Sequence, residues 1–354
     1  MTPQAAIASA DTLRNAFAKA VYFHAVGGPL THNAGCLAEG AMDLGIPVKL
    51  CAPHLTSRPV SMPLKGVDLA ALVSKPTAGF AGYIIDISHT NQFTPFEGIA
   101  GGHLAYLNQS DVAAFAGMPE DQLLFAAHEN AFAHKGGRRH PIAFGLSRGL
   151  IAATERRPPF QTRRRSALRN FRATLNQGVR ALLDMSYVPI LARHMPVDRT
   201  TRAPDAYLEA LLNSAVSLAY GGDFYAPIME NPWFARNDPP LAAAHAFVQL
   251  KAPAVIFRWD SFRLWESLAA GCLTVHLDFE KYGFALPVKP VAWTHYAPID
   301  LDNIAGSVEQ LLDHESDWPA IAEQGRAWAV EHYAPRPTAV RVLSAMLAHP
   351  RAGA

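Results

Sequence analysis

The stretch RWDSFRLWESLAAGCLTVHLD, residues 258–278, decides the fold of the second half of the chain. Its segment FRLWESLAA has apolar residues at helical spacing, and LTVHLD is the apolar run of a buried strand. Asp260 or Ser261 can cap this helix, and Gly271 can end it. Backbone N–H groups and the positive end of the helix dipole then face outward, so the stretch predicts an anion-binding junction.

Charged side chains flank this junction. Arg258 and Arg263 lie on either side of the helix start and can pair with diphosphate oxygens, and Glu266 can accept hydrogen bonds from ribose hydroxyls. A structural interpretation is equally consistent with the spacing, because Arg263 and Glu266 also form an i,i+3 surface pair and the caps are ordinary ones. The spacing alone leaves both interpretations open.

Length and composition set the class of protein. The 354 residues are 50% apolar and 17% charged, enough for about two domains at roughly 100 to 200 residues each. A formal charge of only +1 excludes disorder for the bulk of the chain. The same balance argues against a nucleic-acid binder, which usually carries a broad basic excess. We therefore expect no nucleic-acid partner.

Short apolar runs alternate with helical stretches, which is typical of parallel βαβ units and predicts an α/β fold. We find no internal repeat. In the first half we predict strands at 20–26, 47–52, 82–88, 103–108, 123–129 and 141–147, a turn at 27–35 and a helix at 36–45. In the second half we predict strands at 166–174, 215–222, 254–259 and 273–278, helices at 176–184, 207–214, 262–270, 302–312 and 317–333, and a last helix at 338–349 after breaks at Pro335 and Pro337.

The composition changes abruptly in the segment TERRPPFQTRRRSALRNFR, residues 154–172. We place the domain boundary there, with domains at 1–157 and 158–335 and a C-terminal helix at 336–354 that is expected to cross back to the first domain. The segment is either a solvated linker, which its Pro-Pro pair favours, or a site for a phosphorylated acceptor or anionic lipid headgroups. Its arginines are Arg156, Arg157, Arg163, Arg164, Arg165, Arg169 and Arg172.

Residues 258–278 resemble the nucleotide-sugar-binding signature in the C-terminal domain of GT-B glycosyltransferases, particularly the group 1 and exostosin-like branches. That signature is roughly S-x-R-x-x-E-A-x-A-x-G-C-x-P-V, and Thr274 stands where the family usually has proline. The resemblance covers roughly residues 163–343, and the first half matches in architecture only. The matching positions are Ser261, Arg263, Glu266, Ala269, Gly271, Cys272 and Val275.

This resemblance implies a GT-B-like fold, two doubly wound Rossmann-like domains facing across a cleft. It implies a glycosyltransferase that moves a sugar from a nucleotide diphosphate to an acceptor hydroxyl, with the nucleotide sugar as co-substrate and no other cofactor. The implied donor-binding residues are Arg258, Asp260, Ser261, Arg263 and Glu266 in the second domain. Retaining group 1 enzymes often carry E-x7-E, whose first glutamate falls at Arg258 here, so inversion is favoured.

The first predicted strand is followed by GGPLTHNAG, where Gly27 and Gly28 permit close backbone approach to the donor, although a plain tight turn fits equally. An inverting transferase needs a base near the acceptor hydroxyl. We rank His32 first, then Glu129, then Asp86, all near ends of predicted strands. In the resemblance, His32 lies where several inverting GT-B enzymes keep a catalytic histidine. The alternative is that each is an ordinary core or surface residue.

The sequence predicts no metal site, no membrane-spanning segment and a reduced compartment. Asp300-Leu301-Asp302 resembles a D-x-D metal motif, but Asp302 precedes a predicted helix and is interpreted as its cap, so we expect no metal. Three distant cysteines indicate a reduced, cytoplasmic protein. No run approaches the roughly 18 apolar residues of a membrane span, so at most peripheral contact with the inner face of the membrane is expected.

The acceptor stays open between a glycan, a lipid-linked and a protein acceptor. Two other functions fit the same features. One is a nucleotide-sugar epimerase or phosphorylase-like enzyme, because one fold hosts many activities. The other is a non-catalytic, two-lobed sugar- or nucleotide-binding protein.

Overall fold

The computed structural model describes residues 7–51, 63–75, 79–90, 93, 95–96, 101–110, 119, 121–132, 138–171, 178–225 and 255–349. The chain forms two compact units. Unit 1 consists of Met1–Ala127, Lys135–Ile151 and Glu331–Ala354, and unit 2 of His128–His134 and Ala152–Val330. The predicted division into an acceptor-side and a donor-side domain stays a prediction.

Unit 1 is built on a six-stranded parallel sheet in the order β2-β1-β3-β4-β5-β6. The order reverses at β1, and ligands of such sheets bind at the carboxyl ends of the strands beside that reversal. The loops after β1 and β3 are therefore the first place to look for a site in unit 1. The strands are β1 (Val21–Ala25), β2 (Val48–Leu50), β3 (Gly82–Asp86), β4 (His103–Asn108), β5 (Leu124–Ala126) and β6 (Arg139–Pro141).

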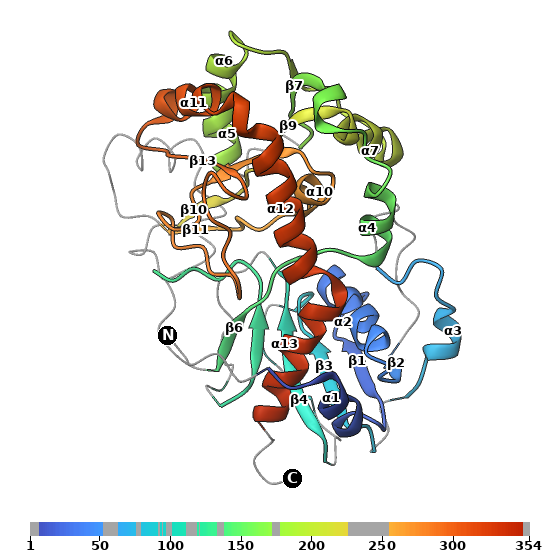
Figure 1. Ribbon diagram of the computed structural model, residues 1–354. Coiled ribbons are helices and arrows are strands. Elements are labelled where there is room, and N and C mark those ends of the chain that lie inside the picture. Colours follow the sequence, from blue (N-terminus) through green and yellow to red (C-terminus); the bar gives the residue numbers. More distant parts are fainter. Residues whose placement is uncertain are drawn as a thin grey trace. The chain divides into compact units, whose positions relative to one another are not determined.

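Helices α2 (His32–Asp43) and α13 (Pro335–Ala348) pack side by side in unit 1 (Figure 1). Gly40 permits this approach, because a Cβ there would lie 2.0 Å from the Pro335 oxygen. The predicted break before the last helix exists at Ala334, between the end of α12 at Tyr333 and Pro335. Both prolines lie in the first turn of α13, where a missing N–H costs no helical hydrogen bond, so the helix begins earlier than the predicted residue 338. The other helices at this end of the chain are α1 (Ala10–Ala16), α3 (Leu69–Leu72) and α4 (Arg148–Thr154).

Unit 2 is built on a five-stranded parallel sheet in the order β13-β12-β9-β7-β8. Read from β8, this is the order of the first five strands of unit 1, although the sequence shows no repeat. The sheet reverses at β7, beside β9. Its strands are β7 (Arg164–Leu168), β8 (Val197–Asp198), β9 (Ser214–Leu218), β12 (Leu273–Leu277) and β13 (Ala297–Ile299).

The predicted α/β class is confirmed for each unit. The helices of unit 2 are α5 (Gly178–Met185), α6 (Tyr187–Leu191), α7 (Pro204–Leu212), α10 (Phe262–Ala269), α11 (Ile304–Asp313) and most of α12 (Trp318–Tyr333). The predicted strand at 254–259 exists as β11 (Val255–Phe257). It pairs antiparallel with β10 (Asp223–Tyr225) and not with the parallel sheet.

Several predicted boundaries are wrong for local reasons. The helix predicted at 36–45 begins at His32, inside the predicted turn. The strand predicted at 141–147 is paired only as far as Pro141, because buried apolar residues beyond it pack in the core without a ladder partner. The strand predicted at 166–174 begins earlier, at Arg164, and residues 172–177 lie outside the described part of the chain.

Candidate functional site

The carboxyl edge of the unit 2 sheet gathers the predicted donor-binding residues. Strands β7 and β9, which flank the reversal of strand order, end at Leu168 and Leu218. Helix α10 begins at Phe262, directly after the Arg258 segment. Ligands of doubly wound sheets bind at this edge. The fold therefore brings the junction that the sequence singled out to the place where the topology predicts a ligand.

Arg258 has a backbone conformation that non-glycine residues rarely adopt, with φ of 57°. Its Nη1 donates to Asp223 Oδ2 over 2.7 Å. Asp223 Oδ1 accepts the Gly178 N–H over 2.9 Å, so one carboxylate joins Arg258 to the start of α5. Left-handed residues of this kind persist only where the surroundings fix them, and they concentrate at functional sites.

The two residues expected to cap α10 have different environments. Asp260 is buried and accepts a hydrogen bond from Trp265 Nε1 over 2.6 Å. Ser261 stands at the N-cap position, but its Oγ is buried without a hydrogen bond to any described residue. Ser261 therefore stands at the cap position without the predicted side-chain bond, and the Asp260 carboxylate binds the indole.

Arg263 and Glu266 form the i,i+3 ion pair that the structural interpretation predicted, with 2.5 Å between Nη1 and Oε2. The guanidinium also lies over the Tyr207 ring, 3.9 Å from its centroid. Burial raises the pKa of Glu266, and the neighbouring Arg263 charge opposes that rise. Arg263 keeps 31% of its side chain exposed, so it can still reach a ligand while it holds Glu266.

Arg180 belongs to this group, and the sequence analysis missed it. Its Nε donates to the Tyr220 oxygen over 3.2 Å, at the end of β9. Burial, followed by the charges of Arg263, Arg258 and Arg169, lowers its pKa to about 10. Arg263, Arg258 and Arg169 therefore lie within electrostatic reach of Arg180. The only available signal was its place in the first turn of the helix that follows β7.

Three carboxylates partly neutralise these arginines. Asp223 pairs with Arg258, Glu266 with Arg263, and Asp184 with Arg169 through two oxygens. Each pair occupies a different arginine, so the four guanidinium groups carry more charge than these carboxylates balance. The cluster thus has a net positive charge in a largely buried setting, where an anion interacts more strongly than in water.

Tyr220 and Gly221 line the same edge. Tyr220 is fully buried, and its hydroxyl has no hydrogen-bond partner among the described residues. A Cβ on Gly221 would lie 3.4 Å from the Arg258 oxygen and 3.5 Å from Arg180 Nη2. The end of β9 therefore touches both the Arg258 backbone and the Arg180 guanidinium.

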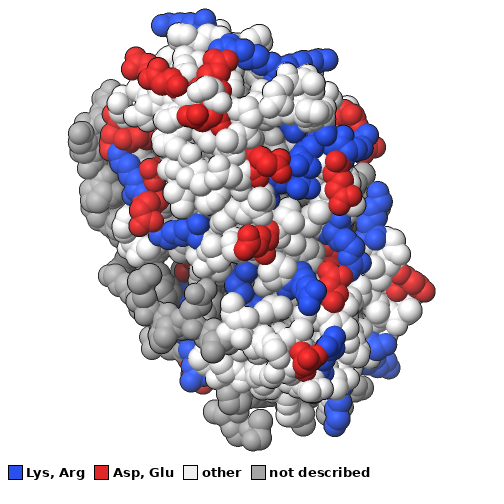
Figure 2. Space-filling model, in the orientation of Figure 1, with Lys and Arg blue, Asp and Glu red and all other residues white. Residues whose placement is uncertain are grey.

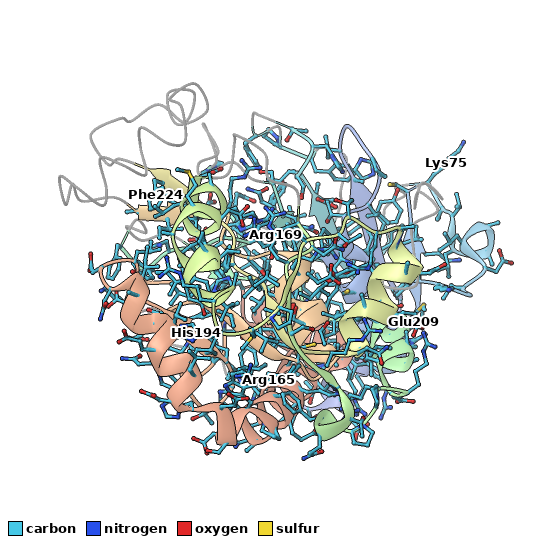
Figure 3. All side chains as sticks on the ribbon, turned by 90° about the horizontal axis from the view of Figure 1, so that it is seen from above. Lys75, Arg165, Arg169, His194, Glu209 and Phe224 are labelled. Carbon is cyan, nitrogen blue, oxygen red and sulfur yellow. The ribbon has the colours of Figure 1, made fainter. Side chains whose placement is uncertain are left out.

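The arginine-rich segment at 154–172 is mostly engaged within unit 2. Arg156 pairs with Glu209 and Arg157 with Glu323. Arg163 donates to the carbonyl oxygens of residues 270 and 271 at the end of α10. Arg165 pairs with Glu315 and donates to the His194 oxygen over 2.9 Å (Figure 3). These contacts support the structural interpretation of the segment, whose last residue, Arg172, lies outside the described residues.

In unit 1, Asp86 organises the loops beside the reversal of strand order. It is fully buried, and Oδ2 accepts the Thr31 N–H over 2.8 Å. Oδ1 accepts both the N–H and the hydroxyl of Ser88, over 3.1 and 2.5 Å. A carboxylate with three donors is fixed in place. These contacts give Asp86 a positioning role in the Gly27–Gly28 loop more readily than a base's role.

Gly27 and Gly28 do need to be glycines, for two different reasons. Gly27 has a left-handed backbone with φ of 73°. A Cβ on Gly28 would lie 2.5 Å from the His89 ring, whose Nε2 lies 2.7 Å from the Pro29 oxygen. The loop is thus packed on His89. Its conformation also allows a ligand to approach the loop backbone closely.

His32 is the first residue of α2 and is buried. Its Nε2 lies 3.3 Å from Cys36 Sγ, one turn along the same helix. A second histidine at the end of β1, His24, was not predicted. It is half-buried, burial lowers its pKa, and its ring lies 4.6 Å from that of Phe96. No sequence signal distinguished His24 from its strand neighbours.

The structure does not bring the three predicted bases together in one unit. His32 and Asp86 belong to unit 1, whereas Glu129 belongs to unit 2. There the Glu129 backbone oxygen accepts hydrogen bonds from Trp259 Nε1 over 3.2 Å and from the Ala285 N–H over 3.0 Å. His128, beside it, has a left-handed backbone with φ of 60°.

Both aspartates of the D-x-D segment form ion pairs with one lysine. Lys281 Nζ pairs with Asp300 and lies 2.7 Å from Asp302. The predicted cap at Asp302 is wrong by one residue, because Asn303 Oδ1 accepts the Gly306 N–H over 3.0 Å. Within the described ranges, no three His, Cys, Asp or Glu side chains gather as metal ligands. None of the described helices has the length and apolarity needed to cross a bilayer.

Acidic and basic side chains alternate on the face of the molecule that Figure 2 presents, where blue and red groups lie next to one another. Ion pairs occur among the described residues, such as that of Lys289 with Glu280. Alternation of this kind matches the near-neutral charge of the sequence.

The chain has no match among family models or curated proteins. Among solved structures, it is similar to an alpha-glucosyltransferase in complex with UDP and a 13-mer DNA containing a HMU base, with a TM-score of 0.50 and 9% identity over 92% of this chain and 99% of that one. It is also similar to an alpha-glucosyltransferase (AGT) in complex with UDP, with a TM-score of 0.48 and 9% identity over 88% and 95% of the two chains. The first likeness shows the fold, and the predicted GT-B-like fold is confirmed.

Proposed function

We propose that this chain is a glycosyltransferase that moves a sugar from a nucleotide-diphosphate donor to an acceptor hydroxyl. The observation that carries the proposal is the cluster of Arg180, Arg258 and Arg263 at the carboxyl edge of the unit 2 sheet. Guanidinium groups bind phosphate oxygens through paired, charge-assisted hydrogen bonds. The similar glucosyltransferase structure holds UDP, which supports a nucleoside diphosphate as the ligand.

In this proposal the arginines act on the leaving group. As the bond from sugar to diphosphate breaks, negative charge develops on the diphosphate, and fixed positive groups lower the energy of that state. Arg180, Arg258 and Arg263 supply the charge, and the N–H groups at Ser261 and the start of α10 supply further donors. Glu266 accepts the ribose hydroxyls. With these donors in place, the transfer needs no metal or other cofactor.

On the acceptor side, His32 is the proposed base, at the start of α2 beside the reversal of strand order in unit 1. Its Nε2 must leave Cys36 Sγ to take a proton from the acceptor hydroxyl. Glu129 remains second in this proposal and Asp86 third, since three donors already occupy the Asp86 carboxylate. Gly27 and Gly28 form the loop that approaches the donor.

Inversion at the anomeric carbon is part of the proposal. Arg258, paired with Asp223, occupies the position at which retaining relatives of the resembled family often carry a glutamate. Proton NMR of the first product formed gives the anomeric coupling, and an unchanged configuration would refute inversion without affecting the assignment of the donor site.

The donor site is tested by thermal stabilisation with UDP, GDP and dTDP, each with and without magnesium, because a ligand selective for the native state raises its stability. We expect one diphosphate to stabilise the protein equally with and without the metal. Arg263→Ala and Glu266→Ala should abolish most of this shift, whereas Arg165→Ala, which removes an exposed arginine paired with Glu315, should not. Equal shifts in all variants would exclude the assignment.

An acceptor panel then separates the candidate functions. Release of nucleoside diphosphate only in the presence of acceptor indicates transfer, and release without acceptor indicates another reaction. Binding without turnover indicates a binding protein. The panel includes glycan, lipid-linked and protein acceptors, and also DNA, because the similar glucosyltransferase was solved with DNA. We expect DNA to be inactive, because the formal charge of +1 gives the chain no broad basic excess.

A further inference from the structure

His276 is a buried titratable residue that the proposed mechanism does not use. It lies on β12 and is fully buried. Its ring is surrounded by those of Trp259, Phe279 and Phe284, with centroids 5.0 to 6.5 Å away. The nearby charge that acts on it is that of Arg180. A polar ring in such surroundings needs its hydrogen bonds, because an unsatisfied buried polar group is costly.

Both ring nitrogens of His276 face backbone carbonyl oxygens. Nδ1 lies 3.1 Å from the Leu277 oxygen, and Nε2 lies 3.2 Å from the Trp259 oxygen. Burial lowers the pKa of His276 to about 4, so the ring is neutral near pH 7. A neutral imidazole has a single N–H, and it can donate to only one of these two acceptors.

The two acceptors differ in what a hydrogen bond to them would achieve. Leu277 is the next residue of the same strand, so a bond to it adds no constraint between distant segments. Trp259 lies 17 positions away in the sequence and directly follows Arg258. An N–H on Nε2 would therefore connect the central sheet to the segment that carries Arg258, the proposed diphosphate ligand.

That segment needs such a restraint. Arg258 has the left-handed φ of 57°, a conformation that persists only when neighbouring contacts hold it. The Trp259 side chain is held by the bond from Nε1 to the Glu129 oxygen and by stacking on Phe284, 4.8 Å between centroids. These contacts hold the indole. The Trp259 carbonyl, at the turn itself, faces His276.

We infer that His276 is a positioning residue that donates from Nε2 to the Trp259 oxygen and thereby fixes the turn that presents Arg258 and the start of α10 to the donor diphosphate. The inference rests on the proposed function. It assigns to His276 no contact with the substrate. Its effect is to raise the fraction of molecules whose arginines are already arranged for binding.

Two substitutions isolate this hydrogen bond. The Nε2 of glutamine in His276→Gln reaches the place of the imidazole Nε2, whereas the shorter His276→Asn places its amide near Nδ1, beside the Leu277 oxygen. Both put a neutral amide into the same buried site, so both lose similar packing. Thermal unfolding of each variant measures that shared loss. Only the glutamine can keep the bond to Trp259.

We expect His276→Gln to bind the stabilising nucleoside diphosphate within threefold of wild type, and His276→Asn to bind at least tenfold more weakly. In turnover the donor KM of His276→Asn should rise, with kcat at saturating donor nearly unchanged. Equal affinities in the two variants would overturn the positioning role alone. A wild-type protein that binds no nucleoside diphosphate would overturn the proposed function, and with it this role.

A measurement on the unmodified chain covers the case in which both variants fail to fold. Long-range ¹H–¹⁵N correlation of the histidine rings at pH 7 reports which nitrogen carries the proton. We expect the buried ring of His276 to be protonated at Nε2. Protonation at Nδ1 would leave the Trp259 oxygen facing a lone pair and would refute the inference.

Discussion

At the scale of single residues, the arginines of unit 2 divide into two kinds. Arg163 and Arg165 complete their hydrogen bonds within the protein and stabilise it. For Arg180, burial and the charges of Arg263, Arg258 and Arg169 disfavour the charged form and lower its pKa. A group that is unfavourable for the folded state and remains charged has a role that stability does not explain, and anion binding provides one.

Replacement of Arg180 tests this distinction. Arg180→Met keeps the length of the side chain and removes a charge that three neighbouring arginines repel, so the ligand-free protein should unfold at an equal or higher temperature. Affinity for the nucleoside diphosphate should fall about tenfold or more, which corresponds to about 1.4 kcal/mol. Calorimetric titration and thermal unfolding measure the two effects.

The control for this experiment is Arg165→Met, which removes an arginine with a carboxylate partner on the surface of the same unit. It should leave nucleotide affinity unchanged. If Arg180→Met destabilised the protein and left affinity intact, Arg180 would be a structural residue.

At the scale of elements, helix starts in this chain are decided by neighbours that the local sequence does not reveal. Asp260 is a good capping residue, but Trp265 Nε1 takes its carboxylate. Asp302 is another, but it pairs with Lys281, and Asn303 caps α11 in its place. Each aspartate is engaged by another side chain, which is five residues along the chain for Asp260 and 21 residues away for Asp302.

A pair of substitutions at α11 distinguishes the cap from the ion pair. Asn303→Ala removes the bond to the Gly306 N–H and should lower the free energy of unfolding by about 1 kcal/mol. Asp302→Ala removes only an exposed ion pair and should cost about 0.5 kcal/mol or less. Chemical denaturation of both variants gives the comparison. A larger loss for Asp302→Ala would mean that Asp302 is the true cap.

At the scale of the whole molecule, two units share one strand order, with the reversal at β1 in one and at β7 in the other. Each reversal gathers polar loops at the carboxyl edge of its own sheet. In unit 1 this edge holds Asp86, at the end of β3, and His32, at the start of α2, and in unit 2 it holds the arginines. A donor site on one unit and an acceptor site on the other is the division of labour that we propose.

Hydrogen exchange with and without the nucleoside diphosphate tests this division. Added protection is expected at the carboxyl edge of unit 2, in residues 219–223 and 258–266, because ligand binding suppresses local opening. The core of unit 1, around α2 and α13, should exchange at the same rate in both states. If protection appeared at the loop after β1 and not in unit 2, the donor would bind unit 1. That result would contradict our proposal.

The sequence by itself was enough to predict the helix and strand of the junction at residues 258–278 and the charged side chains that it carries. The period of FRLWESLAA, the apolar run LTVHLD and the positive φ of Gly271 follow from local sterics and from burial of one helix face, so α10 and β12 were predictable. Arg258, Arg263 and Glu266 were found because they stand within nine residues of one another on that junction.

Only the tertiary structure decided which side chains join them. Arg180 comes from the start of α5 and His276 from β12, and they lie near one edge because the parallel strands of unit 2 end there. Asp223 comes from β10, which pairs antiparallel with β11 outside that sheet. Sequence patterns report burial and local hydrogen bonding. They do not report pairing between distant segments, because strand order sets it and neighbouring residues do not. The carboxylate partners of the arginines, and the role of His276, could therefore be recognised only from the tertiary structure.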